Sequence, residues 1–183
     1  IATLQSEDSD ALVSEWQATE REYPSDATLH ALFEAQAKAT PNAVAVRYED
    51  TALTYRELNE YANQFGHYMQ SLGVGPETLV GVHMDRSAGM LAVLLGILKA
   101  GGAYVPMDPN YPANRVAFMI QDAGISVLLT EEVFLKKLNE ASKLPAETQV
   151  VCLDDEWNKI SRRSKKRVKS DTDAQNRAYV IYT

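Results

Sequence analysis

The sequence predicts an α/β fold, in which helices flank a layered, largely parallel sheet. Short apolar segments with strand-like patterns alternate along the chain with longer segments whose apolar residues recur every three to four positions. Such alternation is typical of parallel sheets, because strands that run the same way need a long crossover connection. The 183 residues, of which 45% are apolar, suffice for one domain with a sizeable core.

The beginning of the chain differs from the rest. Residues 1–25 are polar and acidic at their start, and Pro24 disfavours a helical conformation at the residue before it. We expect residues 1–25 to be an interdomain linker and residues 26–183 to form the core. The chain does not begin with Met and shows no signal-peptide pattern, which suggests a piece of a longer polypeptide.

The core is expected to open with a helix, a strand and a short extended piece. Apolar residues of the segment 27–39 lie at helical spacing, and a proline follows it. In the segment 43–48, Val44 and Val46 alternate with other residues, which predicts a strand with both on one side. A turn then leads to an extended piece at 52–53.

The next helix has the clearest signals. Thr54 and Glu57 match the capping box, in which each side chain binds the backbone N–H of the other residue. Leu53 and Leu58 occupy the two positions of the hydrophobic staple. Gly73 stands where a left-handed residue closes a helix. The expected apolar stripe consists of Leu58, Tyr61, Ala62, Phe65, Met69 and Leu72.

A helix over 87–100 is apolar nearly all round, so we expect it to be buried. It follows a strand over 79–84 and stops at the glycine pair 101–102, where both glycines are expected to adopt unusual backbone angles. A strand over 103–107 comes next. Its Pro106 has no N–H and belongs at a strand end or a sheet edge.

The alternation of helices and strands continues to the end of the chain. A proline-containing turn precedes it, and a polar, basic stretch interrupts it before the final element. The remaining expected elements are a helix up to Asp122, a strand over 125–129, a helix from Glu131, a strand over 150–153 and a strand over 178–182.

Composition argues against several classes of protein. The net charge of -7 gives no support to a nucleic-acid or membrane-surface role, and no apolar run approaches the roughly 18 residues of a membrane-spanning helix. The single cysteine, Cys152, cannot form an intramolecular disulfide, which fits a reducing cytoplasm. We expect it to be a small core residue. No metal ligand is assigned, because no His, Cys, Asp or Glu cluster has metal-ligand spacing.

Two histidines and one basic stretch are the other candidates. His83 lies in an apolar strand and His30 in an amphipathic helix, and both are expected to be structural. The stretch 162–169 holds six basic residues in eight. It could bind an anion or a nucleic acid, but it lacks interleaved aromatic residues. We expect a solvated, mobile surface loop there.

Three segments carry a resemblance to a known family. The segment 53–58, Leu-Thr-Tyr-Arg-Glu-Leu, resembles the first core motif of nonribosomal peptide synthetase adenylation domains. The segment 98–108, Leu-Lys-Ala-Gly-Gly-Ala-Tyr-Val-Pro-Met-Asp, resembles the second nearly residue for residue. The segment 178–183 resembles the opening of the third, although Arg177 stands where the family typically has Leu. Residues 12–24 resemble the linker between a condensation domain and an adenylation domain.

The resemblance implies an ATP-dependent activity. In that family the third motif continues into a phosphate-binding loop, which implies that Thr183, as its first residue, contacts an ATP phosphate. The complete enzyme would bind an amino acid and Mg²⁺-ATP and form an aminoacyl adenylate. It would then load the phosphopantetheine thiol of a peptidyl carrier protein, with a condensation domain in the same assembly line. The loop and the amino-acid pocket would lie in the missing remainder, so this fragment alone is expected to be inactive.

Both complete motifs also have a structural explanation. The first caps a helix, and the second ends one helix and starts a strand, so we assign no catalytic residue. Two alternatives remain: another adenylate-forming ligase, such as an acyl-CoA or aryl-acid ligase, and a non-catalytic interaction module with the same fold. The second motif and the linker disfavour the other ligases. The residues that follow Thr183 would distinguish an enzyme from a module.

Overall fold

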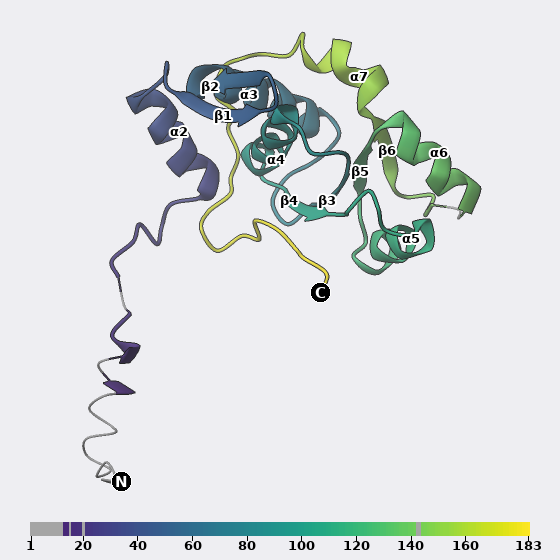
Figure 1. Cartoon of the computed structure of the whole chain (residues 1–183), viewed down its shortest axis with the longest axis horizontal. Coiled ribbons are helices and arrows are strands. Elements are labelled where there is room, and N and C mark those ends of the chain that lie inside the picture. Colours follow the sequence, from purple (N-terminus) through teal and green to yellow (C-terminus); the bar gives the residue numbers. More distant parts are fainter. Residues whose placement is uncertain (1–12, 15, 20, 142–143) are drawn as a thin grey trace.

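The centre of the molecule is a four-stranded parallel sheet, which confirms the predicted fold class (Figure 1). In this computed structural model, the structure describes residues 13–14, 16–19, 21–141 and 144–183. The strand order across the sheet is β4-β3-β5-β6. The strands are β3 (Leu79–His83), β4 (Ala103–Pro106), β5 (Val127–Thr130) and β6 (Gln149–Cys152).

Two helical layers cover the sheet (Figure 1). One layer contains α3 (Tyr55–Ser71), α4 (Ala88–Ala100) and α7 (Leu153–Ile160), and the other contains α5 (Ala113–Asp122) and α6 (Glu132–Ala141). Phe65 and Ile97 of the first layer share a core with Val82. Met119 and Leu138 of the second layer belong to a separate core beneath the opposite face. Among the described helices, none combines the length and apolar character that a bilayer crossing requires.

A smaller unit precedes the sheet. It consists of α2 (Leu29–Ala39) and an antiparallel hairpin of β1 (Val44–Tyr48) and β2 (Thr51–Thr54). The hairpin register shifts between Val44 and Val46, so the simple alternation predicted for these two residues is interrupted. Val44 is exposed and Val46 is half-buried. The bulge changes which side chains face the body.

Helix α3 begins as predicted. The Thr54 hydroxyl accepts from the N–H of Glu57 (3.2 Å), and the Glu57 carboxylate accepts from the N–H of Thr54 (2.8 Å). Gly73 is left-handed, with φ of 85°. The predicted stripe is wrong at Tyr61, which is 37% exposed. Asn63 and Gln64 are buried although polar, because a distant segment binds their amides.

Helix α4 is buried as predicted, with Ser87 as its N-cap and a left-handed Gly101 at its end. Most of its side chains are covered, but Leu91 remains exposed. The expectation of unusual backbone angles holds for Gly101 alone of the glycine pair. Gly102 is needed for space instead, because a Cβ there would lie 2.7 Å from Cγ1 of Val74.

The last part of the chain differs most from expectation. Helix α7 was not predicted, although Leu153 and Ile160 are its buried residues and three acidic residues occupy its first turn. The strand expected over 178–182 is reduced to one parallel bridge between Tyr179 and Tyr104 of β4. The chain from α7 onward is the yellow trace of Figure 1, which ends below β3 and β4.

Candidate functional site at the carboxyl end of the sheet

The carboxyl ends of the four strands lie at one edge of the sheet, and each leads into a helix. Polar residues follow each of these ends. They are Asp85 and Arg86 after β3, Asp108 and Asn110 after β4, Glu131 after β5 and Asp154 beyond β6. In open α/β sheets, ligands bind at this edge, where helix N-termini and loops converge. This edge is therefore the candidate site.

Hydrogen bonds join the loops at this edge. The Glu131 carboxylate accepts from the N–H of Asp85 (3.2 Å), and the Asp154 carboxylate accepts from the N–H of Glu132 (2.8 Å). Each carboxylate ties the loop of one strand to the loop of its neighbour. The edge is thus cross-linked by side chains that short-range sequence patterns do not pair.

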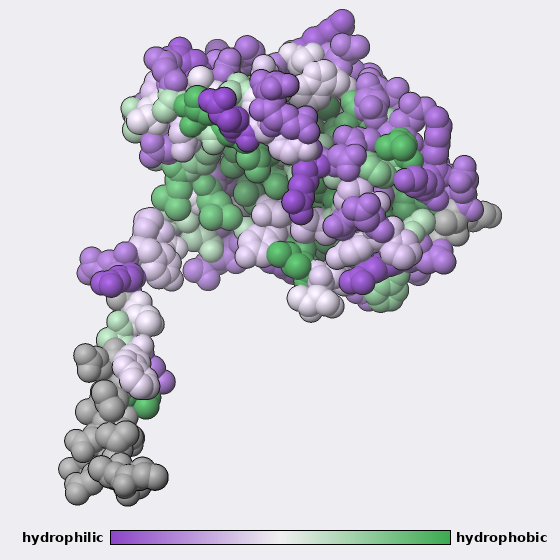
Figure 2. Space-filling view, viewed as in Figure 1, coloured by the Kyte–Doolittle hydropathy of each residue, from purple (hydrophilic) through white to green (hydrophobic). Residues whose placement is uncertain are grey.

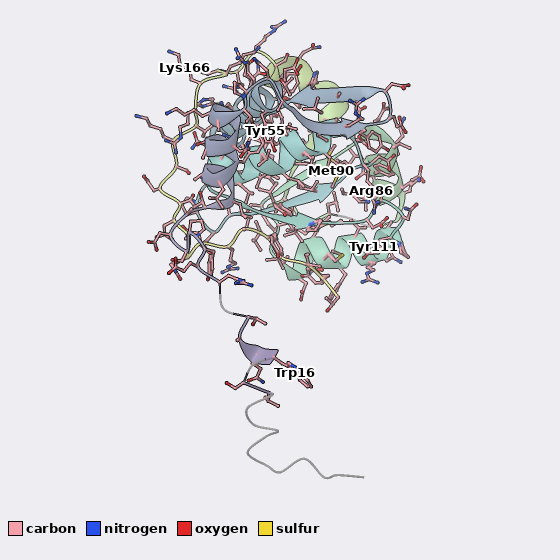
Figure 3. All side chains as sticks on the ribbon, turned by 60° about the vertical axis from the view of Figure 1, so that its left-hand side comes forward. Trp16, Tyr55, Arg86, Met90, Tyr111 and Lys166 are labelled. Atoms are coloured by element: carbon pink, nitrogen blue, oxygen red, sulfur yellow. The ribbon has the colours of Figure 1, made fainter. Side chains whose placement is uncertain are left out.

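Asp108 and Arg86 contribute opposite charges at the edge. Asp108 accepts from the N–H (2.8 Å) and the side-chain amide (3.0 Å) of Asn110. The backbone bond is the main cause of the lowered pKa of Asp108, and the charges of Arg86 and His83 lower this pKa further. Figure 3 shows Arg86 and Tyr111 on one side of the molecule. The guanidinium of Arg115 lies 4.4 Å from the centre of the Tyr111 ring.

His83 is the last residue of β3 and is buried. Its Nδ1 lies 3.4 Å from the Thr130 hydroxyl, and its ring centre lies 5.2 Å from that of Phe134. Nε2 is also buried and finds no hydrogen-bond partner among the described residues. Burial lowers the pKa of His83, so the ring is uncharged near neutral pH. These surroundings agree with the structural role expected from sequence.

Cys152 ends β6 and is half-buried, not a core residue as expected. Its Sγ donates to the Asp154 carboxylate at 3.6 Å. Burial raises the pKa of the Cys152 thiol. Because a thiol with a raised pKa is a poor nucleophile at neutral pH, the structure gives no support to covalent chemistry here. His30 belongs to α2, where Nε2 lies 3.1 Å from the Thr28 hydroxyl.

The segment 178–183 reaches the sheet along β4. The N–H of Tyr104 donates to the carbonyl of Ala178 (3.2 Å), and the N–H of Val180 donates to the carbonyl of Tyr104 (3.0 Å). The rings of Tyr104 and Tyr179 stack at 5.7 Å. Because the pairing is parallel, the segment runs toward the same edge as the carboxyl end of β4. Thr183 is exposed at the end of this segment.

Tyr182 adds one contact beyond the bridge. Its hydroxyl donates to the Asp122 carboxylate at the end of α5 (2.6 Å). Burial and this bond raise the pKa of Tyr182 to about 12. Val180 and Tyr182 pack against the core beneath α5 and α6. The segment that leads to Thr183 is therefore anchored on one face of the sheet.

The basic stretch 162–169 is bound along α3. Asn63 donates to the carbonyl of Lys165 (2.8 Å), His67 to that of Lys166 (3.0 Å) and Gln70 to that of Lys169 (2.7 Å). Gln64 also donates to the carbonyls of Ser161 and Arg163. Sequence correctly predicts solvated side chains, and Figure 3 shows Lys166 projecting from the body. The prediction of a free loop is wrong, because its carbonyls bind a row of α3 side chains.

Close packing and ion pairs reinforce this attachment. Val168 is buried against Gly66, where a Cβ would lie 2.9 Å from Cγ2 of Val168. The Glu34 carboxylate of α2 binds Arg167 (Nε–Oε2, 2.8 Å) with one oxygen and the buried ammonium of Lys99 with the other. Burial lowers the pKa of Lys99, and Glu34 opposes that shift. Lys99 lies in the second motif, where sequence reasoning assigned it no partner.

A parallel α/β sheet with polar loops gathered at the carboxyl ends of its strands defines a protein that binds ligands at that edge. The family model described as AMP-binding enzyme matches residues 33–183. The chain belongs to the AMP-binding enzyme family. The family relationship that the three segments indicated is thereby confirmed.

Curated relatives with high similarity are large synthases. A linear gramicidin synthase from Brevibacillus parabrevis is 44% identical over 172 residues, which cover 94% of this chain and 3% of that protein. Gramicidin S synthase 2 from Brevibacillus brevis is 39% identical over 183 residues, which cover 100% of this chain and 4% of that protein. The chain thus spans only a small part of the length of these relatives.

Solved structures agree with this relationship. The nonribosomal peptide synthetase FmoA3, in its alpha-methyl-L-serine-AMP bound form, matches with a TM-score of 0.82 and 36% identity over 95% of this chain and 19% of that chain. A fatty acyl CoA synthetase from Mycobacterium tuberculosis matches with a TM-score of 0.77 and 18% identity, over 84% of this chain and 32% of that chain. The second match concerns the fold alone.

Proposed function

We propose that this chain is the N-terminal part of an adenylation domain that activates an amino acid with ATP. The supporting observation is the parallel bridge between Tyr104 and Tyr179, because it directs Thr183 to the edge where α/β proteins bind ligands. Similarity to nonribosomal peptide synthetases over 95% of the chain favours an amino acid over the fatty or aryl acids of other adenylate-forming ligases.

The proposed reaction has two steps. A carboxylate oxygen of the amino acid attacks the α-phosphorus of ATP, and the bond to pyrophosphate breaks. The thiolate of a carrier-protein phosphopantetheine then attacks the acyl carbon, and AMP leaves with the bonding electrons. Thr183 is placed to donate its hydroxyl hydrogen to a phosphate oxygen, which would stabilise the charge that develops there. The carrier protein and a condensation domain would be partners in the same assembly line.

The described residues offer a phosphate contact but no set of metal ligands. The Thr183 hydroxyl is exposed and of the type that binds phosphate. Within the described ranges, no group of three or more His, Cys, Asp or Glu side chains could hold a metal ion. We therefore assign none of the described residues to the Mg²⁺ that accompanies ATP, and expect its ligands elsewhere in the complete enzyme.

The organisation of the chain follows from the same proposal. Residues 1–25 would be the linker from a preceding condensation domain, and residues 26–183 the first part of the adenylation core. Trp16 and Tyr23 are both exposed, and Figure 3 shows Trp16 away from the body. An exposed, extended approach to the core fits a linker. A cytoplasmic location is proposed from the single cysteine.

The test is amino-acid-dependent exchange of pyrophosphate into ATP by the complete protein. We expect exchange with one or a few amino acids. Thr183→Ala should lower kcat/KM for ATP by roughly 10- to 100-fold, whereas Thr183→Ser should retain most activity because it keeps the hydroxyl. Thr51→Ala, on the exposed hairpin, is the matched control. Exchange with fatty or aryl acids alone would indicate another ligase, and no exchange with any acid would indicate a non-catalytic module.

A further inference from the structure

We infer that Glu77 is a positioning residue, which fixes the segment that carries Thr183. The inference rests on the proposed function for the role of Thr183. Glu77 lies in the turn before β3, far in sequence from that segment. It is exposed and touches neither Thr183 nor the residues at the carboxyl edge that the structure joins. Its effect would be transmitted through the backbone of residues 176–180.

One carboxylate makes three contacts with two consecutive residues. Oε1 of Glu77 accepts from the side-chain amide of Asn176 (3.0 Å) and from the backbone N–H of Arg177 (3.1 Å). Oε2 pairs with Nε of Arg177 at 2.7 Å. The bonds from Asn176 and Arg177 lower the pKa of Glu77. The backbone bond matters most for positioning, because it fixes the main chain and not only a side chain.

These contacts end directly before the bridge to the sheet. Ala178, the next residue, accepts from the N–H of Tyr104, and Val180 donates to the carbonyl of Tyr104. Two backbone hydrogen bonds alone would hold this register weakly, because a strand at a sheet edge can slip or detach. The Glu77 carboxylate fixes the start of the segment, so that the two bonds to Tyr104 form in one register.

The conformation of Glu77 supports a specific role for its side chain. Its φ is 65°, in the left-handed region that residues other than glycine rarely adopt. Glycine would fit this backbone more easily, but it would lack the carboxylate. Backbone strain of this kind is found where a side chain serves a function. Glu49, in the turn between β1 and β2, has a similar φ of 49° but is not among the contacts of the segment.

The partner of Glu77 is unusual for the family. The resemblance to adenylation domains leads one to expect Leu where this chain has Arg177. An arginine at this position can reach an acidic partner, and Glu77 is that partner. The pair is exposed and should contribute little to global stability. A positioning role and a stabilising role therefore predict different results.

The test compares Glu77→Gly with Glu49→Gly in the complete protein. Each variant replaces an exposed glutamate at positive φ, so backbone relief is matched and only the first removes the carboxylate from the segment. Amide hydrogen exchange in peptides that contain residues 178–183 reports on the register without depending on activity. Steady-state kinetics of pyrophosphate exchange reports on ATP, and thermal unfolding reports on stability.

We expect Glu77→Gly to increase amide exchange of Val180 and to raise KM for ATP by about 5- to 10-fold, with an unchanged KM for the amino acid and an unchanged melting temperature. Glu49→Gly should match the wild type. Glu77→Gln, which keeps one acceptor oxygen, should lie between them. An additional Arg177→Leu substitution should add little to Glu77→Gly, because both remove the same contact.

Three results would overturn the inference. Unchanged exchange at Val180 would show that the carboxylate does not fix the segment. Faster exchange with an unchanged KM for ATP, while Thr183→Ala impairs activity, would show that the segment needs no such positioning, and the proposed function would stand. If Thr183→Ala also left ATP kinetics unchanged, the role of Thr183 and the positioning role would both be wrong.

Discussion

The ammonium group of Lys99 on α4 is buried and pairs with Glu34 of α2, whose second carboxylate oxygen binds Arg167. Asn59 of α3 also accepts from the ammonium group (2.9 Å). One carboxylate thus connects a buried cation to the basic stretch on the surface. Lys99 stands in the second motif, so a residue of that motif holds three helices together.

The two partners of this pair should respond differently to substitution. Glu34→Gln leaves the buried ammonium group of Lys99 without a counter-charge and should lower the free energy of unfolding by about 2–4 kcal/mol. Lys99→Met should cost less, because the carboxylate keeps Arg167 and solvent. Urea unfolding of both variants checks the order. Equal losses, or a larger loss for Lys99→Met, would contradict this account of the pair.

The capping box of α3 offers a second test. Thr54→Ala removes the acceptor of the Glu57 N–H and should lower the free energy of unfolding by roughly 1 kcal/mol. In the complete enzyme its KM and kcat should stay close to the wild-type values. Thr51→Ala, in the same hairpin but outside the cap, is the control. A large fall in turnover at unchanged stability would give Thr54 a role in the chemistry.

The buried imidazole of His83 predicts how stability depends on pH. Its pKa is lowered from 6.5 by burial, so between 6.5 and the folded pKa the unfolded chain binds more protons. Stability should therefore fall as pH decreases from 6.5 through this window and level off below it. The half-buried His30, whose pKa is also lowered by burial, contributes with the same sign.

Replacing each histidine separates these contributions. His83→Leu should flatten the slope of unfolding free energy against pH below 6.5, and His30→Gln should flatten it further. His67→Gln serves as the control, because His67 lies on α3 outside the core. An unchanged slope in His83→Leu would show that another group causes the dependence.

Limited proteolysis tests the attachment of the basic stretch. Trypsin should cut first after Arg21, in the exposed segment before the core, and only later within 162–169. Six basic residues in eight offer many sites there, but the backbone is bound by α3 side chains. Asn63→Ala combined with Gln70→Ala should accelerate cleavage of the stretch. First cleavage within 162–169 in the wild type would contradict the bound state.

A polypeptide of residues 1–183 should be inactive in pyrophosphate exchange. Adenylyl transfer needs several donors around the phosphates, and we assign one hydroxyl, that of Thr183. The same polypeptide should self-associate, because Leu29, Leu32 and Leu91 are exposed apolar residues. Figure 2 shows apolar surface gathered over α2 and the neighbouring part of α4. Amino-acid-dependent exchange above a no-enzyme control would refute the first expectation, and a monodisperse monomer in sedimentation the second.

Local signals explain what sequence predicted well. The cap at Thr54 and the helix ends at Gly73 and Gly101 depend on residues within one or two turns. The alternation of strands and helices depends on periodicity that each segment carries by itself. These features require no knowledge of tertiary contacts, and they suffice for the fold class and the order of elements.

Long-range contacts explain what sequence missed. Asn63 and Gln64 are polar residues on a buried face, because carbonyls of the segment 161–165 satisfy them. The short helix α7 precedes that segment and carries only two buried residues. At the site, sequence proposed Thr183, whereas Glu77 and Lys99 depend on partners from other elements. A lysine in an otherwise apolar helix was the one available signal, since such a charge needs a partner.

The attachment of the terminal segment also has a consequence for the order of folding. Its hydrogen bonds to α3 and to Glu77 join residues between 92 and 105 positions apart. Closing loops of this length is slow compared with forming a β-α-β unit. The sheet and α3 can assemble from earlier residues, whereas the segment must wait until it has been synthesised. We therefore expect the residues that carry Thr183 to reach the sheet last, as the final cooperative step of folding.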